Sequence, residues 1–425
     1  MSSLRTRWER LKKSPWFCIG PGIITGVADD DPSGIGTYSQ AGAQFGLDML
    51  WTIPLAFPLM AAVQSMCGRI GRVTGKGLAA NIKIVFPPVV LKGAVALLLV
   101  ANTLNIGADL AAMGDVAGLV AGWDRHLMTA LFLGISLLLQ LFVPYHRYVS
   151  FLKWLTLSLL AYIAVLFYVH VPWSEVLGHT LWPRFKLDSK AAAVVVGIFG
   201  TTISPYLFFW QASEEVEEMH KPPRAKSLLH DPASAPAELR RIRWDTWTGM
   251  FYSDITAYFI ILATAVTLHV AGVKDISTAA EAASALRPVA GVYAYLLFAV
   301  GIIGVGLMGV PVLAASGAYA WSETLGWKGS LERKPSEARG FYAVIVISVL
   351  VGFALQFLHV SAMKALFWSA IINGVVAVPL MAMVVLLASR KSVLGKFTSP
   401  WWVLSLGWLT TALMGAAAVW MFVAG

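Results

Sequence analysis

Residues 29–34 read Asp29-Asp30-Asp31-Pro32-Ser33-Gly34 and lie well inside an apolar stretch that begins near residue 17. A second interruption, Thr201-Thr202-Ile203-Ser204-Pro205-Tyr206, lies in the middle of the sixth apolar stretch. Because proline removes a backbone donor and clashes with the preceding turn, both stretches predict broken helices. Two broken membrane helices in corresponding positions of two chain halves are typical of the binding site of a secondary transporter. Three consecutive carboxylates in the first break indicate a cationic substrate.

The composition predicts an all-α polytopic membrane protein. Hydrophobic residues make up 58% of the 425 residues and charged residues only 13%, whereas a soluble domain carries roughly a quarter charged residues. A membrane-spanning helix needs about 20 apolar residues. Eleven stretches meet this need, near residues 17–45, 47–68, 93–122, 127–144, 149–170, 190–213, 247–271, 290–320, 340–358, 365–388 and 400–424.

The positions of lysine and arginine predict the orientation. With the N-terminus inside, 25 of the 32 basic residues fall in cytoplasmic segments, which is the asymmetry expected of a membrane protein. The N-terminus is therefore expected in the cytoplasm of the cell and the C-terminus outside. The net charge of +9 then reflects topology and anionic lipid headgroups, and no nucleic-acid partner is expected. The longest polar connection, residues 214–243, is interpreted as a solvated cytoplasmic linker.

The first break carries the negative charge. Asp31 precedes Pro32, which leaves upstream carbonyl groups without helical donors, and Gly34 relaxes the chain before the helix resumes. A carboxylate together with free carbonyl oxygens suits a hard cation. Asp30 and Asp29 either contribute to the same site or face water at the end of the span.

The second break offers only neutral oxygen atoms. They belong to Thr201, Thr202, Ser204 and Tyr206, together with carbonyl groups freed by Pro205. Oxygen-only sites suit Mg²⁺, Ca²⁺ or Mn²⁺, whereas sulfur and imidazole favour transition metals. The alternative is that the Ser204 and Thr hydroxyls donate back to helix carbonyls and do not ligate an ion.

Further polar residues lie inside other apolar stretches. Asn102, Asn105 and Asp109 are three and four residues apart, so they share one helical face. The two asparagines are interpreted as bridges between helices, and Asp109 as a group for ion attraction or proton relay. Asp254 and Asn373 belong to the same category of intramembrane polar groups.

Several short runs are similar to a known family. They are Gly20-Pro21-Gly22, Asp31-Pro32, Gln40-Ala41-Gly42-Ala43-Gln44-Phe45-Gly46, Arg69-Ile70-Gly71-Arg72-Val73-Thr74-Gly75-Lys76, Ala108-Asp109-Leu110-Ala111 and Phe298-Ala299-Val300-Gly301. Together they resemble helices one, two, three and eight of the NRAMP family of divalent metal transporters. The resemblance implies a LeuT-like fold of two inverted five-helix repeats, here residues 17–170 and 190–388. Residues 1–16 would be a cytoplasmic N-terminus and residues 400–424 an eleventh helix.

The resemblance also implies a metal site that departs from the family pattern. By position, Asp31 supplies the carboxylate ligand and Thr201 a backbone-carbonyl ligand. The family motif Asp-Pro-Gly-Asn provides an Asn ligand where this chain has Gly34. The family motif Ala-Thr-Val-Met-Pro-His provides a thioether, which selects transition metals, where this chain has Ser204.

The groups to which proton coupling is attributed in the family are mostly replaced. Asp109 is kept, but the glutamate three residues later is Ala112, and two histidines of the sixth helix are Tyr206 and Gln211. This pattern resembles the NRAMP-related magnesium transporters. It implies uptake of Mg²⁺, and also Mn²⁺, into the cytoplasm by alternating access without proton coupling. The metal ion would be the substrate, with no cofactor.

Other functions remain as alternatives. The first is a proton-coupled Mn²⁺ or Fe²⁺ importer of the ordinary NRAMP type, and the missing Met and His residues argue against it. A sodium-coupled amino-acid transporter of the same fold would need a neutral first break to receive a carboxylate. A receptor or scaffold would leave both breaks unexplained. No enzyme is expected, because the chain has no nucleophile–base set or phosphate-binding glycine loop. The bilayer and the divalent ion are the expected partners, with no obligate protein partner.

Overall fold

A computed structural model describes residues 21–143, 152, 155–183, 189–220, 225–358 and 360–424. Within these residues all regular structure is helical. Nine of the described helices are long and apolar enough to cross a membrane. The first apolar stretch is split into two shorter helices, and the fifth lies partly outside the described residues. The all-α prediction is therefore confirmed.

The described α-helices have the following bounds in chain order. They are α2 (Pro21–Asp29), α3 (Pro32–Phe45), α4 (Thr52–Thr74), α5 (Leu78–Val85), α6 (Pro88–Ala121), α7 (Arg125–Phe142), α9 (Leu160–Val165), α10 (Trp173–Leu181), α11 (Ser189–Thr202), α12 (Pro205–His220), α13 (Ala235–Thr264), α14 (Ala279–Ser284), α15 (Arg287–Ala290), α16 (Ala294–Leu325), α17 (Arg339–Ala354), α18 (Ala362–Ser389), α19 (Lys391–Leu394) and α20 (Trp401–Ala424).

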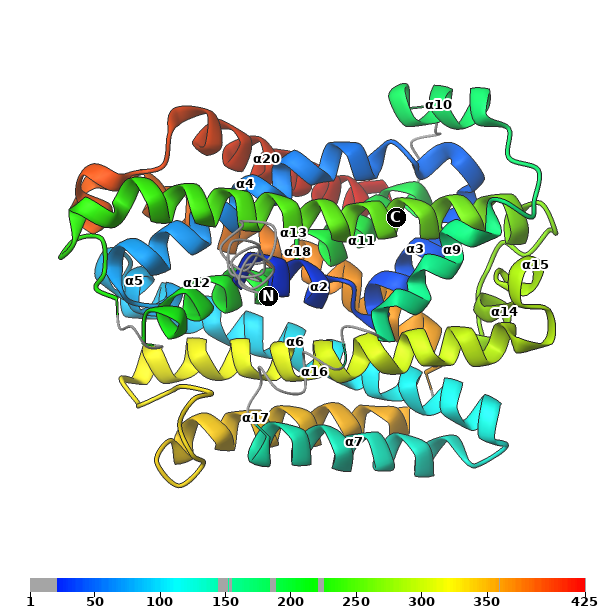
Figure 1. The fold of residues 1–425 in the computed structure, drawn as a ribbon, viewed down its shortest axis with the longest axis horizontal. Helices are drawn as coiled ribbons and strands as arrows, with labels where there is room; N and C mark the ends of the chain where they lie inside the picture. Colours follow the sequence, from blue (N-terminus) through cyan, green and yellow to red (C-terminus); the bar gives the residue numbers. More distant parts are fainter. Residues whose placement is uncertain are drawn as a thin grey trace, which may run out of the picture.

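Long helices surround the two short helices of the first break. In Figure 1, α13, α16, α17 and α7 run nearly parallel, and α2 and α3 lie in the middle of the bundle. Helix α6 packs along α16, and α11 packs against α18. On α3, residues 32–43 are all buried. Protein, and not lipid, therefore surrounds the interrupted backbone, as irregular backbone at membrane depth requires.

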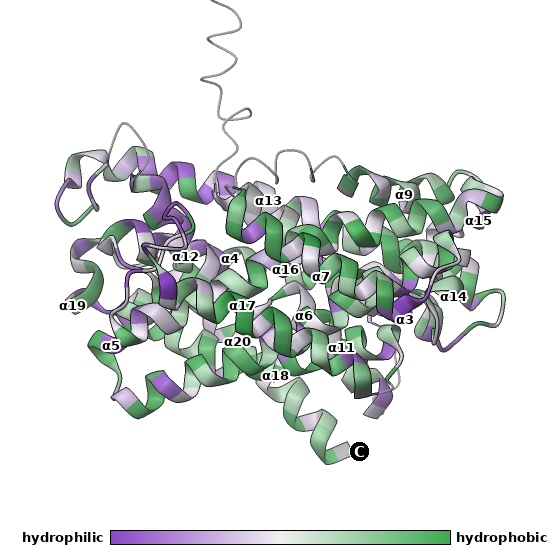
Figure 2. Cartoon of the chain, turned by 90° about the horizontal axis from the view of Figure 1, so that it is seen from below, coloured by the Kyte–Doolittle hydropathy of each residue, from purple (hydrophilic) through white to green (hydrophobic). Residues whose placement is uncertain are grey.

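The peripheral helices present apolar side chains outward. Leu138 on α7, Ile347 on α17 and Trp408 on α20 are 59%, 59% and 46% exposed. Figure 2 shows hydrophobic residues along the middle of the bundle and hydrophilic residues toward its ends, most densely near α5, α12 and α19. This distribution is that of a bundle whose middle faces hydrocarbon.

Helix α2 is seated directly on the backbone of α13. A Cβ atom added to Gly22 would lie 2.6 Å from the Thr246 nitrogen, and one added to Gly26 would lie 2.2 Å from the Gly249 carbonyl oxygen. The Gly22 amide also donates to Asp245 Oδ2 at 2.7 Å. Only glycine allows the two backbones to approach this closely.

The polar connections predicted to share one side of the membrane do lie together. The Leu228 amide donates to the Arg72 carbonyl, Lys83 Nζ donates to the Thr324 carbonyl, and Arg69 donates to the carbonyls of residues 397 and 398. We name this region the basic end of the bundle. Its location in the cytoplasm stays a prediction.

The prediction of a solvated linker over residues 214–243 is wrong. Helix α12 continues to His220 and α13 begins at Ala235, so the connection is much shorter. Glu215 is fully buried and forms an ion pair of 2.6 Å with Arg241. The charges looked solvated in the sequence because the partner that neutralises Glu215 lies on the next helix.

Candidate metal site at two helix breaks

The first break positions the carboxylate of Asp31 at the start of α3. Asp31 has extended backbone (φ −80°, ψ 171°), and its Oδ1 accepts hydrogen bonds from the Gly34 amide at 2.9 Å and the Ser33 hydroxyl at 2.8 Å. Pro32 occupies the first helical position, where its missing N–H costs nothing. An N-capping aspartate followed by proline therefore ends one helix segment and begins the next.

The second break separates α11 from α12 at Pro205. The Ser204 hydroxyl donates to the carbonyls of Gly200 at 3.0 Å and Thr201 at 2.7 Å. Ser204 thus shows the back-bonded arrangement that was the alternative to ligation. The Thr202 hydroxyl lies 2.8 Å from the Tyr38 hydroxyl on α3 and is not hydrogen-bonded to Asp31.

The two breaks meet around the same carboxylate. The Tyr206 hydroxyl donates to Asp31 Oδ2 at 3.4 Å, and the Ser33 and Thr201 hydroxyl oxygens lie 3.4 Å apart. A Cβ atom on Gly34 would lie 3.3 Å from Thr201 Oγ1 and 3.7 Å from Asp31 Oδ1. Asp31, Gly34 and Thr201 are therefore brought together from two segments far apart in the chain, and their role as metal ligands stays a prediction.

Helix α6 contributes a second carboxylate beside this meeting point. Asn105 Nδ2 donates to Asp31 Oδ2 at 2.9 Å and approaches Asp109 Oδ2 at 3.5 Å. Asp109 is fully buried, and its Oδ1 has no hydrogen-bond partner among the described residues. A Cβ atom on Gly309 of α16 would lie 3.0 Å from Asp31 Cβ and 3.8 Å from Asp109 Oδ2. The sequence analysis missed Gly309 because its span contains several glycines, and nothing in the local sequence distinguishes this one as a site residue.

Three other polar residues that the sequence singled out, Asn102, Gln211 and Asn373, form no hydrogen bond with Asp31. Asn102 Nδ2 donates to the Leu313 carbonyl and the Ser316 hydroxyl of α16, at 2.8 and 2.9 Å, so it bridges two helices. Gln211 Oε1 accepts from the Thr25 hydroxyl at 2.7 Å and ties α12 to α2. Asn373 is fully buried, and neither amide atom has a hydrogen-bond partner in the described part.

A separate acidic group surrounds Ser253 on α13. The Ser253 hydroxyl lies 2.6 Å from Asp29 Oδ2 and 2.9 Å from Asp30 Oδ1. Asp29 and Asp30 are only 1% and 2% exposed, so neither faces water at a span end. The neighbouring Asp254 is also buried, with both carboxylate oxygens lacking a described partner. The sequence placed Asp254 among the intramembrane polar groups but could not place it near the first break.

The groups that contact the Asp31 carboxylate are hydrogen-bond donors from both breaks and from α6. Its hydrogen-bond partners are a backbone amide, two hydroxyl groups and a carboxamide. Among the described residues, no three His, Cys, Asp or Glu side chains form a metal-binding group. The oxygen atoms at this meeting point, on Asp31, Ser33 and Tyr206, are of the kind that hard cations prefer as ligands. That they bind a metal ion stays a prediction.

The interrupted helices and the buried carboxylate between them define a polytopic membrane protein with a LeuT-like fold. Over residues 22–424 the chain matches the family model described as "Natural resistance-associated macrophage protein-like". The chain therefore belongs to this family, which confirms the NRAMP resemblance.

Two relatives are named as transporters, not as enzymes. The "Divalent metal cation transporter MntH" of Acidiphilium cryptum (strain JF-5) is 23% identical over 90% of this chain and 84% of its own length. The protein of the same name from Verminephrobacter eiseniae (strain EF01-2) is 33% identical over 45% of this chain and 44% of its own length. The chain thus spans less than half of the second relative.

Two solved structures share the fold. The manganese transporter of Eremococcus coleocola superposes with a TM-score of 0.72 at 18% identity, covering 94% of this chain and 85% of that one. Mhp1, a nucleobase-cation-symport-1 family transporter, gives a TM-score of 0.57 at 14% identity, covering 95% and 92%. At these identities the likeness establishes the LeuT-like fold.

Proposed function

We propose that this protein carries divalent metal ions across the membrane by alternating access, with Asp31 as its charged ligand. The observation that carries the proposal is the position of the Asp31 carboxylate, 1% exposed, where both helix breaks meet. A carboxylate at membrane depth is a functional group by default because it is costly to keep there. The names of the two relatives, both divalent metal cation transporters, support the same substrate class.

The site favours Mg²⁺, and also admits Mn²⁺. Mg²⁺ gives up its waters reluctantly, so its site needs space and few protein ligands. Gly34 and Ser204 are both small, and Gly34 faces the second break: a Cβ atom on Gly34 would lie 3.3 Å from Thr201 Oγ1. Ser204 and Tyr206 stand where the family pattern has a thioether and an imidazole. Without a soft ligand, the site loses the means to reject hard ions.

The same substitutions argue against proton coupling. A phenol, an amide and a methyl group stand at Tyr206, Gln211 and Ala112, where the family pattern has two imidazoles and a carboxylate. A phenol changes protonation only far above neutral pH, and an amide or a methyl group does not change it at all. Asp109, linked to Asp31 through Asn105, is then a group that attracts the ion.

Access to Asp31 requires contacts at both ends to separate. Toward the basic end, Thr25 is tied to Gln211 at 2.7 Å. Toward the opposite end, Gln40 Oε1 accepts from the Ile276 amide at 2.9 Å. Opening one set while the other holds would expose the site to one side at a time. In our proposal the basic end and the N-terminus face the cytoplasm and the C-terminus lies outside.

Proteoliposome flux measurements test the proposal. Purified protein should take up both Mg²⁺ and Mn²⁺, each should compete with the other, and an internal pH dye should show no proton movement tied to metal flux. Asp31→Ala should reduce both fluxes to the level of empty liposomes. Mn²⁺ flux without Mg²⁺ flux or competition would contradict the magnesium assignment. Proton movement in fixed ratio to metal would contradict the uncoupled mechanism, and amino-acid flux would point to the alternative substrate class.

A further inference from the structure

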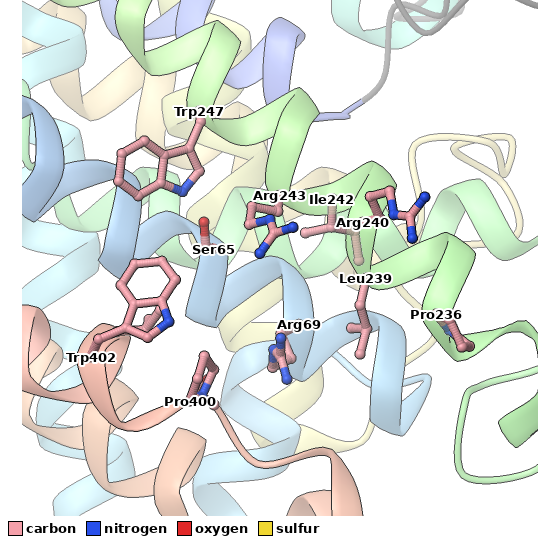
Figure 3. Close-up of a pocket in the computed structure, with 12 residues that line it drawn as sticks. Ser65, Arg69, Pro236, Leu239, Arg240, Ile242, Arg243, Trp247, Pro400 and Trp402 are labelled. Atoms are coloured by element: carbon pink, nitrogen blue, oxygen red, sulfur yellow. The ribbon is translucent and has the colours of Figure 1, made fainter.

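A basic cavity lies where α4, α13 and the start of α20 meet, at the basic end of the bundle. Its volume is about 250 Å³, and it is lined by Ser65, Arg69, Arg240, Arg243, Trp247 and Trp402 among others. Figure 3 shows Arg69 and Arg243 beside the two tryptophans, with residues from α4, α13 and the segment around Pro400 enclosing the space. This cavity is separate from the metal site, since none of its lining residues contributes a hydrogen bond to Asp31.

The cavity carries uncompensated positive charge. Three arginines line it, and no aspartate or glutamate does. Arg69 is held in place by hydrogen bonds to the carbonyls of Phe397 and Thr398 at 3.2 and 3.1 Å. Within the described part of the chain, neither Arg69 nor Arg243 is within ion-pair distance of a carboxylate. Two guanidinium groups therefore share a cavity in which only an anion would balance them.

Neutral donors in the same cavity also lack acceptors. Ser65 Oγ, Trp247 Nε1 and Ser399 Oγ line it, and each is a buried atom without a hydrogen-bond partner among the described residues. Buried polar atoms are usually paired, so three unpaired donors around one cavity indicate a missing acceptor. A group with several oxygen acceptors would satisfy them together with the arginines.

The surroundings of the cavity place it at the level of lipid headgroups. Trp244 and Trp401, which flank the lining, are 62% and 78% exposed, and Phe251, further along α13, is 52% exposed. Tryptophan is enriched at the boundary between hydrocarbon and water, and arginine near it contacts phosphate. The apolar surface of α13 beyond this level would contact acyl chains.

We propose that this cavity binds the phosphate headgroup of an anionic phospholipid. Arginine presents planar paired donors that match phosphate oxygens, and basic pockets between membrane helices bind such headgroups. The lipid would bridge α4, α13 and α20, and its acyl chains would lie along the exposed apolar side chains of α13 and α20. The site is independent of the metal function proposed above.

The proposal is tested by measuring how much anionic phospholipid the purified protein retains. Wild type and three variants, Arg243→Gln, Arg243→Lys and Arg390→Gln, are purified in mild detergent and examined by native mass spectrometry after exchange into micelles containing phosphatidylglycerol or phosphatidylcholine. Arg390 is an exposed arginine at the same end but outside the lining, so Arg390→Gln is the matched control for lost charge. Parallel thermal-unfolding curves with inorganic phosphate separate a lipid headgroup from a free ion.

Wild type and Arg390→Gln should retain phosphatidylglycerol in preference to phosphatidylcholine. Arg243→Gln should weaken that retention by about fivefold, the loss of one basic contact, and Arg243→Lys should restore most of it. Equal retention by Arg243→Gln and Arg390→Gln would overturn the proposal. Stabilisation by inorganic phosphate alone, with no retained lipid, would overturn it in favour of a soluble anion.

Discussion

Asn105 Nδ2 donates a hydrogen bond of 2.9 Å to Asp31 Oδ2, and both residues are at most 1% exposed. This bond joins the middle of α6 to the first helix break. One turn earlier on α6, Asn102 donates to the backbone and side chain of α16 instead. Variants of these two asparagines can therefore be compared: one removes a contact to the candidate metal site, and the other removes a bridge between two helices.

Asn105→Ala should lower metal flux by at least about tenfold, because loss of a hydrogen bond to a charged group costs roughly 1.5–3 kcal/mol and leaves Asp31 less well oriented. Asn102→Ala should reduce thermal stability, by about 1 kcal/mol for lost interhelical bonds, with flux per folded protein nearly unchanged. Flux and unfolding midpoints measured on the same preparations decide this. Equal flux loss in both variants would contradict the assignment of Asn105 to the site.

Gly34→Ala should reduce Mg²⁺ flux more than Mn²⁺ flux. The added Cβ would lie 3.3 Å from Thr201 Oγ1 and 3.7 Å from Asp31 Oδ1, in space that a hydrated ion would use, and Mg²⁺ keeps its waters more firmly. Gly93→Ala is the matched control, since nothing lies within 4 Å of its Cβ position. Competition between the two ions in one liposome preparation gives the ratio of Mg²⁺ flux to Mn²⁺ flux. If Gly34→Ala leaves this flux ratio unchanged, space at Gly34 does not govern the choice of ion.

Ser204→Met should shift selectivity toward Mn²⁺, because a thioether is a soft ligand. Ser204→Leu fills comparable volume without sulfur and removes the same hydroxyl bonds to Gly200 and Thr201. The prediction is that Mn²⁺ flux in the presence of excess Mg²⁺ is higher in the methionine variant than in the leucine variant. If the two variants discriminate equally, size and not ligand softness governs this position.

Removing Arg241 should lower the free energy of unfolding more than removing its ion-pair partner Glu215. Arg241→Gln leaves the fully buried Glu215 without its ion-pair partner. We expect this to reduce the free energy of unfolding by roughly 3–5 kcal/mol. Glu215→Gln costs less, because Arg241 keeps Glu238 at 3.1 Å. Unfolding midpoints of the two single variants and the double variant test the order, and the double variant should be more stable than Arg241→Gln alone.

Proline, glycine and charge patterns allowed the breaks and their central carboxylate to be predicted, because these effects are local in sequence. The contacts of Ser253 with Asp29 and Asp30 could not be predicted, since more than 200 residues separate them. The buried Glu215 was misread as solvated for a related reason: its partner lies 26 residues away on another helix. The close approach of Gly309 to Asp31 likewise depends on how α16 packs, which no local pattern specifies.

The seating of α2 on α13 makes the two helices one mechanical unit. Because a Cβ atom added to Gly26 would lie 2.2 Å from the Gly249 carbonyl oxygen, the two backbones are in direct contact, and we expect α2 and α13 to move together when the first break opens. Helix α13 has 30 residues, which makes it about 45 Å long. A tilt of α13 about the ion site would therefore move its first residue, Ala235, further than the residues beside the break.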